Sequence, residues 1–253
     1  GGVNNLDSHL RANLKELADA QKYPEVDVLV RQGDGQGDSR DFRVEGQQLV
    51  PVGNTRPQVN SADPAHLAEF VKRGIAQYPS QHYALVVSSH GQGANGVIED
   101  ERHGQLMPMA EFARALEAGG RRFDLVVFDA CRMQTVEVAR ELRGRAEVAV
   151  GSMDRVGSHG FDPAVLLGEL ARGEDARTVA RRLVENNQPR QLEMFGSLSA
   201  VDLQATADLE EALAGIAQQF RQLDSETAHR VRHIATLTRR ALPSPGYLEG
   251  LDN

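Results

Sequence analysis

Short apolar runs alternate with longer amphipathic segments along most of this chain. The apolar runs have the length of buried strands, and they cover residues 26–30, 83–88, 123–128, 148–150 and 198–203. Apolar residues at helical spacing predict helices over 6–21, from Asp63-Pro64 onward, and over 109–118, 133–142, 163–172, 176–186, 205–223 and 225–241. The sequence also predicts a turn at 33–38, a hairpin through 42–44 and 49–52, and a long polar loop over 91–104.

This alternation predicts an α/β fold with a largely parallel central sheet and helices on both faces. No linker rich in Pro, Ser or Gly divides the sequence, so we expect a single domain over residues 1–253. In open α/β sheets, active and binding sites form beyond the carboxyl ends of the strands. The polar residues that follow each apolar run are therefore the first candidates for function.

Two of the apolar runs end in residues that can carry out covalent chemistry. Residues 83–88 lead into Ser89-His90-Gly91, and residues 123–128 lead into Asp129-Ala130-Cys131. Cys131 is the only cysteine in the chain, which excludes an intrachain disulfide. A base and a thiol at the ends of two neighbouring buried strands form a candidate nucleophile pair.

The reactive form of such a cysteine is the thiolate, and an ordinary thiol is mostly protonated at neutral pH. We expect Cys131 to lie just before the helix predicted over 133–142, whose N-terminal dipole favours the anion. His90 would then carry the proton during acyl transfer, and the N–H groups of Gly91 and Cys131 would hold the developing oxyanion. The alternative interpretation makes Cys131 a small buried apolar residue and His90 an ordinary turn residue.

The charge balance of the chain limits the classes of binding partner that we expect. The chain has 36 acidic side chains against 28 Lys and Arg, a formal net charge of −8. This balance argues against nucleic acid or an anionic membrane as the main partner, and it suits a cationic substrate. No apolar stretch reaches the roughly 18 residues needed to span a membrane.

The two central motifs resemble those of a known family. Residues 88–93 (SSHGQG) and 128–133 (FDACRM), with Glu137-Val138-Ala139 after them, resemble the clostripain-like cysteine peptidases. These belong to the wider caspase-like group, with gingipains, legumain and metacaspases. The family pattern has Leu where this chain has Arg132, which we expect to point to solvent. The resemblance runs from about residue 3 to about residue 223, and it includes Asn4-Asn5-Leu6-Asp7 at the start of the first helix.

This resemblance implies a caspase-like α/β/α sandwich and a cysteine endopeptidase that cleaves after Arg or Lys. His90 would be the base or acid and Cys131 the nucleophile. Asp129 would lie at the floor of the primary specificity pocket, where a carboxylate pairs with a basic side chain. Ser152, Met153 and Asp154 would form a pocket wall, with Asp154 as a second acid. Two alternatives stay open: Asp129 as the N-cap of helix 133–142, and Asp154 as an ordinary surface residue.

The resemblance also bears on processing and on the ends of the chain. Family members carry an apolar strand just before the Asn-Asn-Leu segment, so an upstream first strand is expected, as is a C-terminal extension after Asn253. Some relatives cut their own chain between the two motifs, and Arg102 is the candidate here; an uncut, solvated arginine is the alternative. Calcium supports the activity of some relatives, so the resemblance leaves calcium dependence open, but we can assign no calcium site in this sequence. No other cofactor is expected. A secreted or periplasmic bacterial protein is implied.

Several other patterns do not change this interpretation. Residues 91–96 fit G-x-G-x-x-G, but no helical spacing follows, so nucleotide binding is not expected. Asp34, Gln36, Asp38 and Glu45 stand at calcium-loop spacing without the required glycine, which favours a turn. No second metal ligand stands at metal spacing beside His103 or His159, so no metal site is predicted.

The apolar stripe of the helix predicted over 205–223 is expected to pack in the core rather than to bind a partner. It consists of Leu209, Leu213, Ile216, Phe220 and Leu223. Two rivals to the peptidase remain: a catalytically silent caspase-like domain that binds basic peptides or protein partners, and a nucleotide-binding doubly wound domain.

Overall fold

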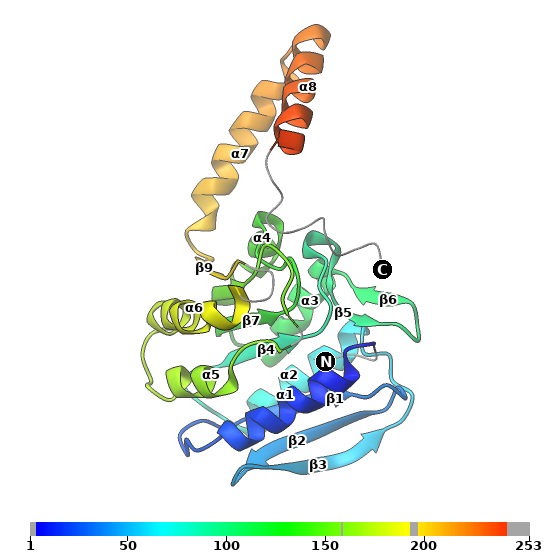
Figure 1. Cartoon of the computed structure of the whole chain (residues 1–253), viewed down its shortest axis with the longest axis vertical. Helices are drawn as coiled ribbons and strands as arrows, with labels where there is room; N and C mark the ends of the chain where they lie inside the picture. The colour runs from blue at the N-terminus through cyan, green and yellow to red at the C-terminus, as the bar shows by residue number, and fades with distance from the viewer. Residues whose placement is uncertain (1–3, 158, 193–196, 242–253) are drawn as a thin grey trace. The chain divides into compact units, whose positions relative to one another are not determined.

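A computed structural model describes residues 4–157, 159–192 and 197–241 (Figure 1). The chain divides into two compact units, Gly1–Gln204 and Ala205–Asn253. The first unit carries the sheets and every residue proposed for the site, and the second carries two helices. The single domain expected over residues 1–253 stays a prediction, because this division does not decide whether either unit folds alone.

The central sheet of the first unit has the strand order β4-β7-β8-β9. Its strands are β4 (Ala84–Ser88), β7 (Phe123–Asp129), β8 (Ala146–Gly151) and β9 (Ser199–Asp202). The pairs β4–β7 and β7–β8 are parallel, and β9 is antiparallel to β8. The predicted α/β class with a largely parallel sheet is confirmed.

Helices cover both faces of this sheet. They are α1 (Asp7–Ala20), α2 (Pro64–Gln77), α3 (Met109–Leu116), α4 (Val136–Leu142), α5 (Pro163–Leu170) and α6 (Ala176–Leu192), with short 3-10 turns η1 (Gly93–Asn95) and η2 (Glu117–Gly119). Asp63 and Asp162 cap α2 and α5 by accepting a hydrogen bond from the backbone two residues on, and a proline follows each cap.

Strand β7 is buried on both faces because its side chains alternate between two apolar cores. Val126 and Phe128 pack in the cluster that includes α2, α3 and α4, where the Phe128 ring lies 5.7 Å from that of Phe112. Leu125 and Val127 pack in the cluster of α5 and α6. This two-sided burial explains why residues 123–128 form a continuous apolar run.

The outer edge of β4 borders a cavity. No described strand pairs with this edge, and the Val86 side chain on it is 41% exposed. The cavity has a volume of about 730 Å³ and is lined mainly by apolar side chains of α1, β4, α5 and α6, with Asp129 among its lining residues. The upstream first strand expected from the sequence stays a prediction.

The remaining strands form two small antiparallel sheets. The first contains β1 (Leu29–Gly33), β2 (Ser39–Glu45) and β3 (Gln48–Arg56), and the second contains β5 (Val97–Asp100) and β6 (Gln105–Met107). The buried strand predicted over 26–30 is therefore wrong in position and burial. It runs to Gly33 because Leu29 to Gly33 pair with Arg43 to Ser39. The polar loop predicted over 91–104 likewise contains η1 and β5.

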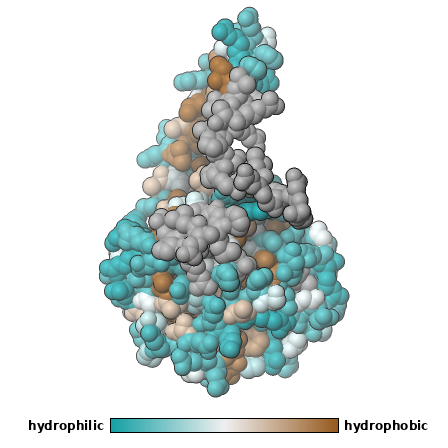
Figure 2. Space-filling model, viewed as in Figure 1, coloured by the Kyte–Doolittle hydropathy of each residue, from teal (hydrophilic) through white to brown (hydrophobic). Residues whose placement is uncertain are grey.

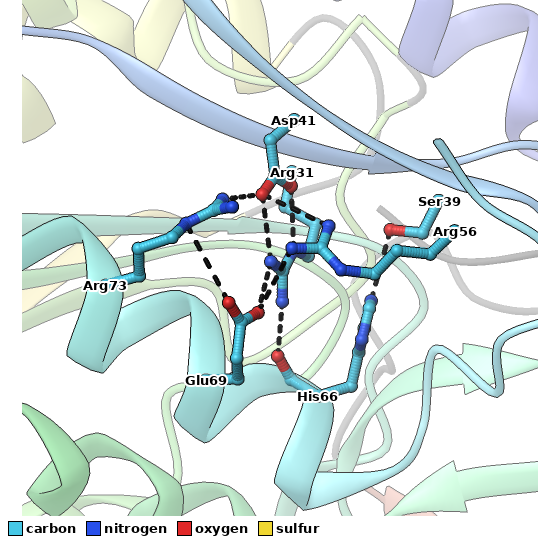
Figure 3. Close-up of polar contacts among 7 residues, drawn as sticks. All are labelled: Arg31, Ser39, Asp41, Arg56, His66, Glu69 and Arg73. Carbon is cyan, nitrogen blue, oxygen red and sulfur yellow. Dashed lines mark hydrogen bonds and ion pairs between the residues drawn. The ribbon is translucent and has the colours of Figure 1, made fainter. Parts of the chain in front are cut away.

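A buried charge network joins the β1–β3 sheet to α2 (Figure 3). Asp41 on β2 is fully buried and forms ion pairs with Arg31, Arg56 and Arg73. The Arg31 guanidinium is bidentate on this carboxylate, at 2.8 and 2.9 Å, and also contacts Glu69 of α2. Because three cations converge on one buried acid, the sheet and the helix are held together by Asp41.

The second unit consists of α7 (Thr206–Arg221) and α8 (Ser225–Ala241). Leu209, Leu213, Ile216 and Phe220, from the apolar stripe of α7, are 43–48% exposed, so this helical pair does not bury the stripe by itself and the predicted core position stays a prediction. Figure 2 shows apolar side chains at the surface of this helical pair. Two helices bury too little surface to enclose such a stripe. Among the described residues, no helix is both long and apolar enough to cross a membrane.

The Asp41 network yields a stability prediction. Asp41→Asn should lower the free energy of unfolding by about 3 kcal/mol, because it leaves buried guanidinium groups without their shared counter-charge. The matched control Glu69→Gln, at a side chain 46% exposed, should cost less than about 1 kcal/mol. Urea unfolding of both variants measures the difference, and equal losses would contradict the central role of Asp41.

His66 yields a pH prediction. Burial, followed by the charges of Arg31 and Arg56, lowers its pKa from 6.5 to about 4, against smaller opposing effects of Glu69 and Asp63. Between these pH values the unfolded chain binds a proton that the folded chain does not, so this contribution to stability falls as pH falls from about 6.5 to about 4.

His66→Gln should therefore flatten the dependence of the unfolding free energy on pH across that window. Urea titrations at several pH values measure the slope, and His9→Gln, at an exposed position of α1, is the matched control. A His66→Gln variant with the parent slope would contradict the buried, neutral imidazole.

Candidate active site

The parallel pairing of β4 with β7 brings the two sequence motifs to one edge of the sheet. Ser88 is the register partner of Asp129, and His90 and Cys131 each follow by two residues. The strands continue past this pair, since Ser89 N–H donates to the Asp129 carbonyl at 3.3 Å. Both His90 and Cys131 are half-buried. The sequence-predicted base and thiol therefore lie at the carboxyl ends of adjacent strands.

Gly91 sits in direct contact with the cysteine segment. A Cβ atom at this position would lie 2.6 Å from the Cys131 carbonyl oxygen and 2.7 Å from the Met133 sulfur. Only glycine fits there without a shift of one segment. Within the described residues, neither the Gly91 N–H nor the Cys131 N–H donates a hydrogen bond. Both groups predicted for the oxyanion hole are thus available as donors.

Two asparagines position the histidine segment. The His90 Nε2 atom lies 2.8 Å from the Asn5 Oδ1 atom. An amide oxygen accepts, so Nε2 carries the proton of this pair and Nδ1 keeps a lone pair. Asn4, which is 6% exposed, donates from Nδ2 to the Ser89 hydroxyl at 3.3 Å and to the Glu99 carbonyl at 3.2 Å. The sequence did not predict these partners, because its only local signal for them is the Asn-Asn pair itself.

The helix after the cysteine starts later than predicted. Helix α4 begins at Val136, and its N-cap is Thr135, whose side chain accepts from the Val138 N–H. Both the placement of Cys131 directly before a helix and the alternative of Asp129 as N-cap are therefore wrong. The chain instead turns at Cys131 and Arg132, where Arg132 has φ 61°, and stays irregular up to α4. Arg132 is exposed, as predicted.

The loop after β8 runs alongside this turn. Arg132 N–H donates to the Asp154 carbonyl at 2.9 Å, and Gln134 N–H donates to the Ser152 carbonyl at 3.0 Å. Farther along, the Val156 N–H donates to the Cys131 sulfur at 3.4 Å. The Cys131 sulfur also lies 4.0 Å from the Val156 carbonyl oxygen, so the loop after β8 contacts the thiol through both backbone groups of Val156.

Three residues predicted for the pocket wall lie in the same loop. Ser152 is 1% exposed, and its hydroxyl accepts the Asp154 N–H at 3.0 Å. Met153 is 67% exposed, and its N–H donates to the Ser197 hydroxyl. The half-buried Asp154 carboxylate accepts the Arg155 N–H at 2.8 Å. The side chain of Ser152 thus braces the loop from inside, and Met153 and Asp154 lie nearer its surface.

The Asp129 carboxylate is half-buried, on the strand that leads to Cys131. Its Oδ2 atom accepts a hydrogen bond from the Ser88 hydroxyl at 2.6 Å. Gly160, with φ 58°, lies so close that a Cβ atom there would overlap this carboxylate. Asp129 is therefore held between its partner strand and the end of the loop after β8.

Arg102, the candidate processing site, lies in the turn between β5 and β6 and is exposed. Its guanidinium donates to the Gln36 carbonyl and to the Gln58 side chain. The other two sequence patterns also lie away from any α-helix. The glycine pattern at 91–96 contains the 3-10 turn η1, and strand β5 follows it. Asp34 accepts from the N–H groups of Gln36 and Asp38 within a turn.

An α/β/α sandwich with a thiol and an imidazole at the carboxyl edge of its parallel strands defines the caspase-like class of cysteine peptidase folds. The sequence profile of the clostripain family of peptidases, C11, matches residues 1–240. The chain therefore belongs to the clostripain family, a family of cysteine peptidases. Curated protein sequences give no match.

Solved structures agree with this class. A secreted C11 cysteine protease from Bacteroides thetaiotaomicron, in complex with an irreversible peptide inhibitor, is 23% identical with a TM-score of 0.74, over 86% of this chain and 68% of that one. An inactive zymogen C11 protease from Parabacteroides distasonis is 23% identical with a TM-score of 0.69, over 82% of this chain and 61% of that one. At these identities the likeness concerns the fold, and this chain spans about two thirds of their lengths.

The close approach at Gly91 yields a prediction. Gly91→Ala should lower the free energy of unfolding by about 1–3 kcal/mol, because the added methyl group forces apart two packed segments. The control Gly215→Ala, on α7 with nothing within 4 Å of an added Cβ, should be neutral or slightly stabilising. Thermal unfolding measures both, and a fully stable Gly91→Ala variant would contradict the packed approach of the two motifs.

Proposed function

We propose that this chain is an endopeptidase that hydrolyses protein or peptide substrates after Arg, or Lys, through a Cys131–His90 dyad and an acyl-enzyme. The observation that carries the proposal is the β4–β7 register, in which His90 and Cys131 stand level, two residues beyond the Ser88–Asp129 pair. The packing of Gly91 on the Cys131 carbonyl supports it further.

The reaction follows from the groups at this edge. His90 Nδ1 takes the thiol proton, and the Cys131 sulfur attacks the carbonyl carbon of the scissile bond. The N–H groups of Gly91 and Cys131 donate to the oxyanion. The imidazolium then protonates the leaving amine, which departs and leaves a thioester. His90 next takes a proton from water, whose oxygen attacks the thioester, and the acid product and the thiol are released.

Asn5 is a positioning residue in this scheme. By accepting the hydrogen bond from His90 Nε2, its amide oxygen holds the ring and leaves Nδ1 as the basic atom. Nε2 keeps its proton through the cycle, because only Nδ1 exchanges protons with the thiol, the leaving amine and water. The amide holds the ring without adding a charge to the site.

Asp129 is the residue proposed to select a basic side chain. A half-buried carboxylate, held by Ser88 and close to the nucleophile along the strand, offers a charge-assisted pair to Lys and a bidentate one to Arg. Met153 and Asp154 would line the outer wall, with Ser152 holding their loop. No nucleic-acid, membrane or cofactor role is part of the proposal, and calcium dependence stays an expectation.

Arg102 remains the proposed site of self-cleavage. It lies between the two motifs in an exposed turn, where a second molecule can reach the backbone. Its guanidinium must leave Gln36 and Gln58 to enter a specificity pocket. Secretion by a bacterium also remains a proposal, in line with the secreted protease from Bacteroides thetaiotaomicron.

The test compares matched fluorogenic peptides that end in Arg, Lys, Asp or Ala. The parent chain should cleave after Arg or Lys, and Cys131→Ala should abolish turnover. Asp129→Asn should lower kcat/KM for the basic peptides about 10- to 100-fold, the size expected for a lost charge-assisted contact. Asp154→Asn is the matched variant: it removes the same charge from the other acid proposed for the pocket, so comparing the two variants shows which carboxylate selects the basic side chain.

Each alternative has its own outcome in this test. Cleavage after Asp would keep the dyad and overturn the role of Asp129. Activity that survives Cys131→Ala would overturn the nucleophile. An inert parent chain whose Cys131 also alkylates no faster than a free thiol would favour the silent, peptide-binding domain.

A further inference from the structure

A second set of ligand-type side chains surrounds His90. Glu99 on β5 and Glu101 just after it approach the imidazole, and one donor atom from each of the three residues lies within 4.8 Å of the others. His90 and Glu99 are half-buried and Glu101 is exposed, so the group opens to solvent. The sequence predicted no metal site, because the spacing between His90 and the two glutamates matches no metal-ligand motif.

The backbone directs Glu99 toward the histidine. Ile98 has φ 64°, which is unusual for a β-branched residue, and the register of β5 with β6 shifts between Val97 and Glu99. Ile98 stands at this register shift, and its N–H donates to the His90 carbonyl at 3.1 Å. Bulges of this kind re-aim a side chain, and they recur next to active sites.

Two further hydrogen bonds fix Glu99 beside the histidine segment. Its N–H donates to the Ser89 hydroxyl at 3.3 Å, and its carbonyl accepts from Asn4 Nδ2 at 3.2 Å. The backbone of Glu99 is therefore tied to both elements that position His90, and Glu101 lies in the turn that directly follows β5.

Successive side chains on β5 point to opposite sides, so Asp100 faces away from the group formed by His90, Glu99 and Glu101. Asp100 is fully buried and accepts from Ser61 and His103. Burial raises its pKa, but these hydrogen bonds outweigh burial, so the pKa of Asp100 lies below its ordinary value. Asp100 thus has its own partners on one side of the strand, and Glu99 and Glu101 are left for the other.

Among the described residues, no Lys or Arg forms an ion pair with Glu99 or Glu101. Two carboxylates held this close repel each other unless a cation lies between them. One imidazole nitrogen with two carboxylates is a donor set that Zn²⁺ accepts, whereas calcium prefers oxygen ligands alone.

We propose that His90, Glu99 and Glu101 bind one Zn²⁺ ion, and that this ion reversibly inhibits the peptidase. The inhibition rests on the proposed function of His90. A metal on Nδ1 occupies the lone pair that takes the thiol proton, and a metal on Nε2 displaces the hydrogen bond to Asn5. In either case, the imidazole cannot both hold the metal and carry the proton.

The first experiment measures binding without activity. Isothermal titration of ZnCl2 into the full chain carrying Cys131→Ala should give one site, because the proposed ligands exclude the thiol. Adding Glu99→Gln and Glu101→Gln should weaken binding at least 10-fold. Adding Glu211→Gln and Glu226→Gln instead, which removes the same charge from exposed positions on α7 and α8, should leave binding unchanged.

The second experiment measures inhibition with the thiol intact. Zn²⁺ should inhibit cleavage of the Arg peptide, and EDTA should restore it. The Glu99→Gln/Glu101→Gln variant, measured relative to its own metal-free rate, should need at least 10-fold more Zn²⁺ for half-inhibition. Equal binding by the Gln pair and the control pair would overturn the site, as would binding that requires Cys131. Binding without inhibition would overturn the regulatory role. A chain with no peptidase activity would fail the proposed function, and the titration would still decide the site.

Discussion

The parallel pairing of β4 with β7 is the constraint on which the rest of the site depends. Side chains alternate on β7, so a slip by one residue would turn Val126 and Phe128 out of one core and Leu125 and Val127 out of the other. The two cores therefore fix the register, and the register fixes where His90 and Cys131 stand. Apolar burial on both faces thus determines the geometry of the polar groups at the strand ends.

Side-chain hydrogen bonds complete the site where the strand ladder ends. Asn4 joins the start of α1 to Ser89 and to the Glu99 carbonyl, and Asn5 reaches His90. Because Asn4 is almost fully buried, its amide satisfies backbone and hydroxyl groups that would otherwise lose their partners to burial. The segment that leads into α1 therefore contributes side chains to the site, although it lies far from both motifs in the sequence.

The sequence predicted the central strands and the edge at which the site forms, because continuous apolar runs and their polar ends are local signals. It placed the start of α4 too early: Met133 is apolar at helical spacing, but residues 132–135 use their backbone to bond the loop after β8. It placed the first strand too early, over 26–30 instead of Leu29–Gly33, because Arg31 is polar in sequence and is buried through its ion pair with Asp41. The approach of Glu99 to His90 depends on a bulge, which no spacing reveals.

Backbone strain marks the same edge of the molecule. The non-glycine residues with positive φ are Gln47, Gln58, Ile98 and Arg132 in the part of the chain that the structure describes. Gln47 lies in the β2–β3 turn and Gln58 in the turn after β3, whereas Arg132 follows the thiol and Ile98 bonds to the His90 carbonyl.

A left-handed backbone conformation costs a residue other than glycine about 1–2 kcal/mol. Ile98 and Arg132 both adopt this conformation although neither is glycine. At Arg132 the conformation sends the chain away from the strand direction directly after Cys131, and the bond to the Asp154 carbonyl holds it there. Strain of this kind persists only where surrounding contacts over-determine it. The strain lies directly after the thiol and at the residue bonded to the His90 carbonyl, which indicates that the fold holds both segments in place against local backbone preference.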